Sequence, residues 1–195
     1  FLRSISDGFS QLKETYDNIR KMKIVGTFLL AYWLYEDGVA TIIRMAVKVG
    51  SSMGFAPSDL IIAILMVQFI GVPAALLYNW IGTKIGVKNA VLIAICFYGV
   101  ATLLAYFMTE RSHFYLLAVL IGCFQGGLQA LSRSLYTRLI PKNKEAEFFG
   151  FYNMLGKFAA VIGPVLMGWI TLTTGNVRYG ILSILILFVL GAMFL

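Results

Sequence analysis

The chain has 195 residues, of which 59% are hydrophobic and only 13% are charged. This composition excludes an ordinary soluble domain and predicts a protein that lies mainly in lipid. The formal charge of +7 does not indicate nucleic-acid binding, because the basic residues are neither gathered in one groove nor interleaved with exposed aromatic residues. A spanning helix and its connection take roughly 30 residues, so the length predicts about six spans.

Residues 1–22 form the first predicted unit. Apolar residues recur there at steps of four and three, with polar and charged residues between them: Ile5, Phe9, Leu12, Tyr16 and Ile19. This spacing predicts an amphipathic helix that lies on the cytoplasmic surface of the membrane. The alternative is a linker that is ordered only by contacts within a whole protein, because Gly8 weakens a helix.

Residues 23–195 form the second predicted unit, an all-α integral membrane bundle. Each of its six apolar segments is near the length that ~30 Å of hydrocarbon requires. They are expected at about 24–48, 58–82, 88–108, 113–138, 148–172 and 178–195. Connections on alternate sides place most of the basic residues on the same side as both chain ends. The positive-inside rule predicts that this side is cytoplasmic.

Two carboxylates lie near the middle of the first predicted span. Glu36 and Asp37 are about 18 to 20 Å from its start at a rise of 1.5 Å per residue. A charge at this depth costs at least ~2.5 kcal/mol on insertion scales, so both are candidates for substrate binding or proton coupling. Lys157 has a similar depth in the fifth span, and a contact between Asp37 and Lys157 is therefore a hypothesis. Such a pair would either fix helix packing or take part in transport.

Polar residues in the fourth predicted span align on one helical face, at spacings of four, three and four: Gln125, Gln129, Ser132 and Tyr136. This stripe predicts the lining of a water-filled cavity. The alternative is that the glutamines are only hydrogen-bond partners between helices. Gln68 in the second span is a weaker candidate of the same kind.

Two aromatic residues and two small-residue motifs complete the candidate set. Tyr32 and Tyr35 lie within the helical turn before the carboxylates and either bound the cavity or pack in the core. Gly126 and the Gly163–Pro164 pair are candidates for close helix packing or for a moving gate, and the latter predicts a bend in the fifth span.

Catalysis has no positive support in the sequence. No His/Cys cluster, glycine-rich phosphate loop or Ser/His/Asp constellation can be assembled, so neither an enzyme nor a cofactor or metal site is predicted. Glu36 and Asp37 are neighbours on a helix and point about 100° apart, so they do not converge on one substrate atom. Cys96 and Cys123 lie inside apolar runs and are interpreted as ordinary buried thiols.

Several strings carry a resemblance to a known family. The loop over residues 82–88, together with six helices and a Gly–Pro bend, resembles half of a major facilitator superfamily transporter. Thr83 and Val87 depart from that superfamily's loop motif, which has an acidic and a basic residue at these positions. More specific strings are similar to the autophagy-linked vacuolar effluxer family: Tyr35–Glu36–Asp37–Gly38–Val39, Gln125–Gly126–Gly127, Ser132–Arg133–Ser134, Gly156–Lys157–Phe158–Ala159 and Arg178–Tyr179–Gly180.

The resemblance implies a twelve-helix protein whose halves rock about a site at the membrane midplane, with this chain as the carboxyl-terminal half. The first and fourth helices would then face the central cavity, with Arg133 among the gating or packing residues. The implied partners are the lipid bilayer, an amino-terminal six-helix half and a small-molecule substrate. A homodimer would be another way to cover the cavity face of an isolated half.

The implied function is secondary active transport of a small polar solute by alternating access, for example amino-acid efflux, with proton coupling as a hypothesis. The implied location is a bacterial inner membrane, with several spans and both ends in the cytoplasm. The alternative function is a six-helix assembly or scaffolding module without transport activity. A polar stripe buried in helix contacts, rather than lining a wet cavity, would favour that alternative.

Overall fold

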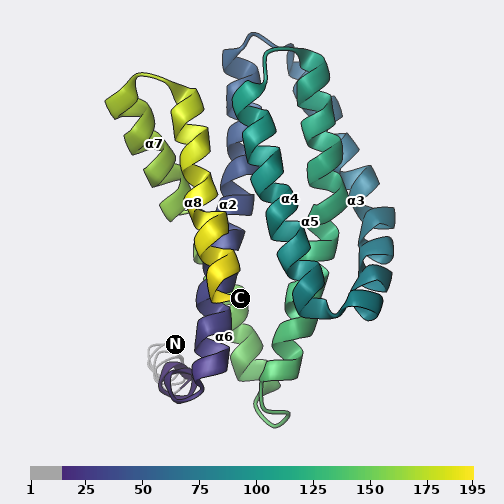
Figure 1. The fold of residues 1–195 in the computed structure, drawn as a ribbon, viewed down its shortest axis with the longest axis vertical. Coiled ribbons are helices and arrows are strands. Elements are labelled where there is room, and N and C mark those ends of the chain that lie inside the picture. The colour runs from purple at the N-terminus through teal and green to yellow at the C-terminus, as the bar shows by residue number, and fades with distance from the viewer. Residues whose placement is uncertain (1–14) are drawn as a thin grey trace, which may run out of the picture.

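The computed structural model describes residues 15–195, and the regular structure in this part of the chain is helical (Figure 1). Residues 15–21 form a short helical segment. The elements that follow are α2 (Lys23–Ser52), α3 (Pro57–Ile85), α4 (Val87–Phe107), α5 (Arg111–Leu139), α6 (Glu145–Phe158), α7 (Ile162–Thr174) and α8 (Val177–Phe194). Most of the predicted amphipathic segment, residues 1–14, lies outside the described residues.

Five helical stretches in the described part of the chain are long and apolar enough to cross a membrane: α3, α4, α5, the stretch Glu145–Thr174 and α8. The all-helical membrane class is therefore confirmed. The remaining predicted span corresponds to α2, which has 30 residues. Its two adjacent carboxylates, Glu36 and Asp37, lower its apolar character, and its crossing of the membrane stays a prediction.

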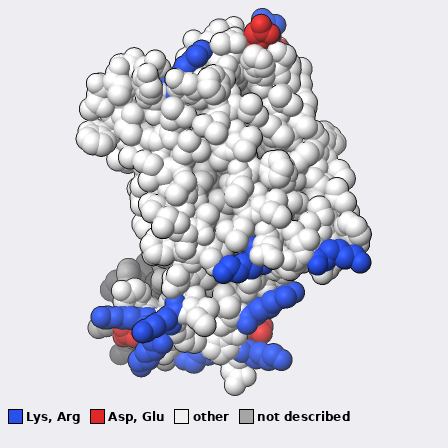
Figure 2. Space-filling view, in the orientation of Figure 1, with Lys and Arg blue, Asp and Glu red and all other residues white. Residues whose placement is uncertain are grey.

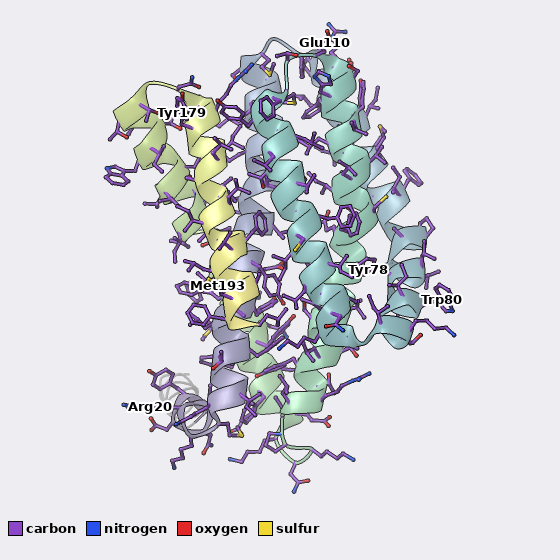
Figure 3. All side chains as sticks on the ribbon, in the orientation of Figure 1. Arg20, Tyr78, Trp80, Glu110, Tyr179 and Met193 are labelled. Carbon is purple, nitrogen blue, oxygen red and sulfur yellow. The ribbon has the colours of Figure 1, made fainter. Side chains whose placement is uncertain are left out.

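The helices pack side by side in one bundle, with α3 and α7 at its edges (Figure 1). α5 lies between α3 and α4, and α8 contacts α2, α4 and α7. Gly127 of α5 lies directly against the ring of Tyr78 of α3, where a Cβ atom would collide with that ring. Figure 3 shows Tyr78 pointing into the bundle and Trp80 pointing away from it. The Tyr78 hydroxyl donates to the carbonyl of Ala90, 2.7 Å away, and so ties α3 to α4.

The fifth predicted span is broken rather than bent. α6 ends at Phe158 and α7 begins at Ile162. Between them, Ala160 has a φ of 83°, a left-handed conformation that is costly for an alanine. Pro164 explains the position of the break, because a proline ring inside a helix clashes with the carbonyl four residues earlier, here that of Ala160. The interruption therefore lies one turn before the Gly163–Pro164 pair on which the prediction placed it.

On the face of the bundle that Figure 2 shows, charged residues gather at the two ends and leave an uncharged band between them. Lys and Arg are concentrated at the end that carries residues 15–21 and the connection between α5 and α6. Arg20 lies at this end and Glu110 at the other, beside the connection between α4 and α5 (Figure 3). This distribution is what a helix bundle embedded in a bilayer requires.

Candidate functional site

A polar cleft of about 630 Å³ lies between α2, α5 and α6. Each helix presents to it residues spaced one turn apart, so their side chains share one face. The lining residues are Tyr32, Glu36, Gly126, Gln129, Ala130, Arg133, Tyr152, Asn153, Gly156 and Lys157. The cleft therefore combines one carboxylate with two cations and two amides.

Glu36 is the carboxylate of the cleft. Its side chain is partly buried, and one of its oxygens, Oε2, is inaccessible and has no hydrogen-bond partner among the described residues. Gln129 lines the same cleft as this carboxyl group. A proton can satisfy this inaccessible oxygen, while the part of the carboxylate that lines the cleft can face a ligand cation.

The two cations lie on α5 and α6. Arg133 is exposed, and its guanidinium donates to Asn153 Oδ1 at 3.2 Å. The guanidinium carbon is also 5.8 Å from the centre of the Phe149 ring. Lys157, in the last turn of α6, is exposed at the same cleft. A guanidinium, an ammonium group and a neighbouring amide together form a donor set suited to a carboxylate or a similar anion.

An aromatic stack borders the cleft. The Tyr32 and Tyr152 rings are stacked with their centres 4.1 Å apart. Tyr136 continues the stack, with its ring centre 4.9 Å from that of Tyr152 and 5.7 Å from that of Phe28. The Tyr136 hydroxyl donates to the carbonyl of Phe148 at 3.0 Å. The stack joins α2, α5 and α6 and fixes the distance between the walls of the cleft.

Asp37 does not line the cleft, although it is next to Glu36 in sequence. Its side chain is almost fully buried, with 1% of the residue exposed. Its carboxylate accepts the backbone N–H of Ile162 at 2.9 Å and that of Gly163 at 3.0 Å, and the Thr41 hydroxyl donates to it at 3.3 Å. Asp37 thus caps the N-terminus of α7, where backbone N–H groups have no partner within the helix and a negative charge is favourable.

The hypothesis of a contact between Asp37 and Lys157 is corrected by this arrangement. No ion pair joins these two side chains, both of which belong to the described part of the chain. The estimate of depth along each helix was insufficient, because the break before α7 supplies backbone donors that occupy both oxygens of Asp37. Lys157 instead shares the cleft with Glu36.

The predicted stripe on the fourth span is divided between three environments. Gln129 lines the polar cleft, whereas Gln125 lines a separate, mainly apolar pocket with Gln68. Ser132 is buried and accepts a hydrogen bond of 2.7 Å from the hydroxyl of Tyr35. Tyr35 and the other end of the stripe, Tyr136, therefore hold helices together and do not face the cleft.

The small residues of the candidate set also separate. Gly126 borders the cleft and lies against α3, where an added Cβ atom would be 3.0 Å from the Gly71 oxygen. Gly163 is buried against Asp37 and Thr41. Pro164 lines another groove, between α2 and α7.

Sequence reasoning missed Tyr152, Asn153 and Gly156. The sequence held one signal for them. Asn153 precedes Lys157 by four residues in an apolar segment, so the two polar side chains share one face of α6.

Comparisons with known proteins agree on one family. The family model described as "Vacuole effluxer Atg22 like" matches residues 1–195. The chain is 38% identical over 191 residues to the uncharacterized MFS-type transporter YxiO of Bacillus subtilis. This alignment covers 98% of this chain and 45% of YxiO. It is 32% identical over 198 residues to autophagy-related protein 22 of Yarrowia lipolytica, covering 95% of this chain and 33% of that protein. The chain thus spans less than half the length of these relatives.

Proposed function

The chain belongs to the Atg22-like vacuole effluxer family of multi-pass membrane transporters, and on this basis we propose that it is the carboxyl-terminal half of a secondary transporter. In this proposal α2 crosses the membrane as the first of six spans and is held within the bundle by α8. The polar cleft faces a second, amino-terminal set of six helices. The two halves rock about the cleft and expose it to each side of the membrane in turn.

The proposed substrate is a small zwitterion, such as an amino acid. The observation that carries this proposal is the presence of both charge signs in one cleft. Glu36 supplies an acceptor for a substrate ammonium group, and Arg133 with Lys157 supplies donors for a substrate carboxylate. Such groups are rare at membrane depth unless they serve a ligand or an ion pathway. The family description, a vacuole effluxer, is consistent with export as the direction.

Two further elements complete the proposal. The protein is assigned to a bacterial inner membrane. The positive-inside rule assigns the basic end of the bundle, and with it both chain ends, to the cytoplasm. Glu36 is assigned as the proton-coupling group, because its unpartnered oxygen can hold a proton when no substrate is bound. Alternatively, an isolated half covers its cleft by forming a homodimer.

The test is transport by the full-length protein in proteoliposomes, with a panel of zwitterionic, anionic and cationic amino acids. We expect Glu36→Gln and Arg133→Gln each to weaken binding of a zwitterion by about 10- to 100-fold, the value of a hydrogen bond to a charged group. The matched controls are Glu110→Gln and Arg138→Gln, which remove the same charges outside the cleft. Equal transport by all four variants would refute the assignment of the cleft.

The second candidate function is a scaffolding module without transport. The Asp37 cap and the hydrogen bond between Tyr35 and Ser132 favour it, because both are buried contacts that only join helices. A full-length protein that folds and transports no member of the panel, with or without a proton gradient, would support this alternative.

A further inference from the structure

A second groove lies at the basic end of the bundle, apart from the polar cleft. It has a volume of about 330 Å³ and is formed by the starts of α2 and α4 and the ends of α5 and α8. Ile24, Phe28, Leu135 and Leu139 contribute apolar walls. The volume lies at the lower end of the range for ligand pockets, ~300–1,000 Å³. The groove is therefore a candidate site for an apolar chain.

Two lysines belong to this otherwise apolar groove. Lys23 is the first residue of α2 and Lys88 the second residue of α4, and both are exposed. Neither forms an ion pair with another residue of the range 15–195, and the groove-lining residues include no acidic side chain. Thr27 is the remaining polar wall residue, and its hydroxyl already donates to the carbonyl of Lys23 at 2.8 Å. The groove thus offers two positive charges to a ligand that is otherwise apolar.

The position of the groove matches the boundary between lipid headgroups and acyl chains. Lys23 and Lys88 lie at the starts of α2 and α4, and the face seen in Figure 2 changes from a basic end to an uncharged band. Ile24, beside Lys23, is 72% exposed, so apolar and positively charged surface adjoin at one level. Basic pockets between spanning helices attract anionic lipid headgroups, whereas a free anion would gain nothing from the apolar walls.

We propose that this groove binds one anionic glycerophospholipid. Its phosphate lies between the ammonium groups of Lys23 and Lys88, and one acyl chain follows the wall made by Phe28, Leu135 and Leu139. A zwitterionic lipid binds more weakly, because its own headgroup cation competes with the lysines for the phosphate. The site is independent of the substrate cleft and holds the ends of α2, α4, α5 and α8 together.

Native mass spectrometry of the full-length protein, titrated with phosphatidylglycerol or phosphatidylcholine, tests the site. The double variant Lys23→Gln/Lys88→Gln is expected to bind phosphatidylglycerol on the order of 30-fold more weakly, since each basic residue near a headgroup contributes about 1 kcal/mol. The matched control is Lys21→Gln/Lys142→Gln, which removes two exposed lysines from the same end outside the groove. It is expected to bind like the unmodified protein.

A second variant tests the acyl chain. Leu139→Trp fills the apolar wall and is expected to weaken binding of both lipids, with thermal unfolding used to verify that the variant is folded. If both double lysine variants bind phosphatidylglycerol equally weakly, the proposal is overturned, because the whole basic end would then attract the anionic lipid. Loss of binding in the lysine variant together with unchanged binding in Leu139→Trp would also overturn it.

Discussion

Replacement of Asp37 by asparagine separates a structural role from a role in transport. The carboxylate uses one oxygen for the N–H of Ile162 and the other for that of Gly163. Asparagine keeps one acceptor oxygen and turns an amide N–H₂ group toward the other donor. Because the position is 1% exposed, water cannot replace the lost acceptor.

The cost can be worked out from these contacts. One buried N–H donor without a partner costs about 1–3 kcal/mol. Loss of the negative charge at the N-terminus of α7 adds up to about 2 kcal/mol in a partly buried site. We therefore expect Asp37→Asn to lower the free energy of unfolding by about 1–5 kcal/mol.

The assay is unfolding of the full-length protein in detergent micelles, combined with transport normalised to the amount of folded protein. Asp37→Asn is expected to lose stability but to keep transport per folded molecule. Glu36→Gln is expected to keep the stability of the wild type and to lose transport per folded molecule, because Glu36 faces the cleft. An Asp37→Asn protein that is as stable as the wild type but does not transport would refute this reasoning.

Three further predictions concern the contacts that shape the bundle, and each is measured by the same unfolding assay. Gly163→Ala places a methyl group against Thr41 Oγ1 and Asp37 Oδ1 and is expected to cost about 1–3 kcal/mol through overpacking; wild-type stability would contradict the close approach of α7. Ala160→Gly is expected to stabilise the protein by about 1 kcal/mol, because glycine accepts the positive φ without strain; a loss of stability would argue against that conformation. Tyr78→Phe removes the hydrogen bond to the Ala90 carbonyl and is expected to cost about 1 kcal/mol, whereas an unchanged unfolding midpoint would rule out a contribution from that bond.

The ends of most helices could be predicted because charge, proline and glycine mark them. The second predicted span, 58–82, corresponds to α3, which begins at Pro57, where the missing N–H of proline is harmless. The fifth span was the exception, because a Gly–Pro pair predicts a bend without saying whether the helix continues through it. Its interruption depends on a partner for the freed N–H groups, and that partner, Asp37, lies on another helix.

The candidate site was predictable in composition but not in arrangement. Depth along a helix could be calculated from the sequence, and it made Asp37 and Lys157 comparable in level, but in the structure Lys157 shares a cleft with Glu36 instead. Rotation about the helix axis could not be assigned, and residues 36 and 37 differ by about 100° in that respect. Gln125 and Gln129 share a face of α5 but lie about 6 Å apart along its axis. They line different pockets because the neighbouring residues differ at these two levels.

The Asp37 cap also has a consequence for biogenesis. An unpaired N–H group in the hydrocarbon core costs several kcal/mol, so the first turn of α7 is unstable in lipid until it finds an acceptor. That acceptor precedes Ile162 by 125 residues, and the chain is synthesised from its amino terminus. Asp37 has therefore already been synthesised when α7 leaves the ribosome. A circular permutant that moved α7 ahead of α2 would reverse this order and deliver the donors to the bilayer before their acceptor exists.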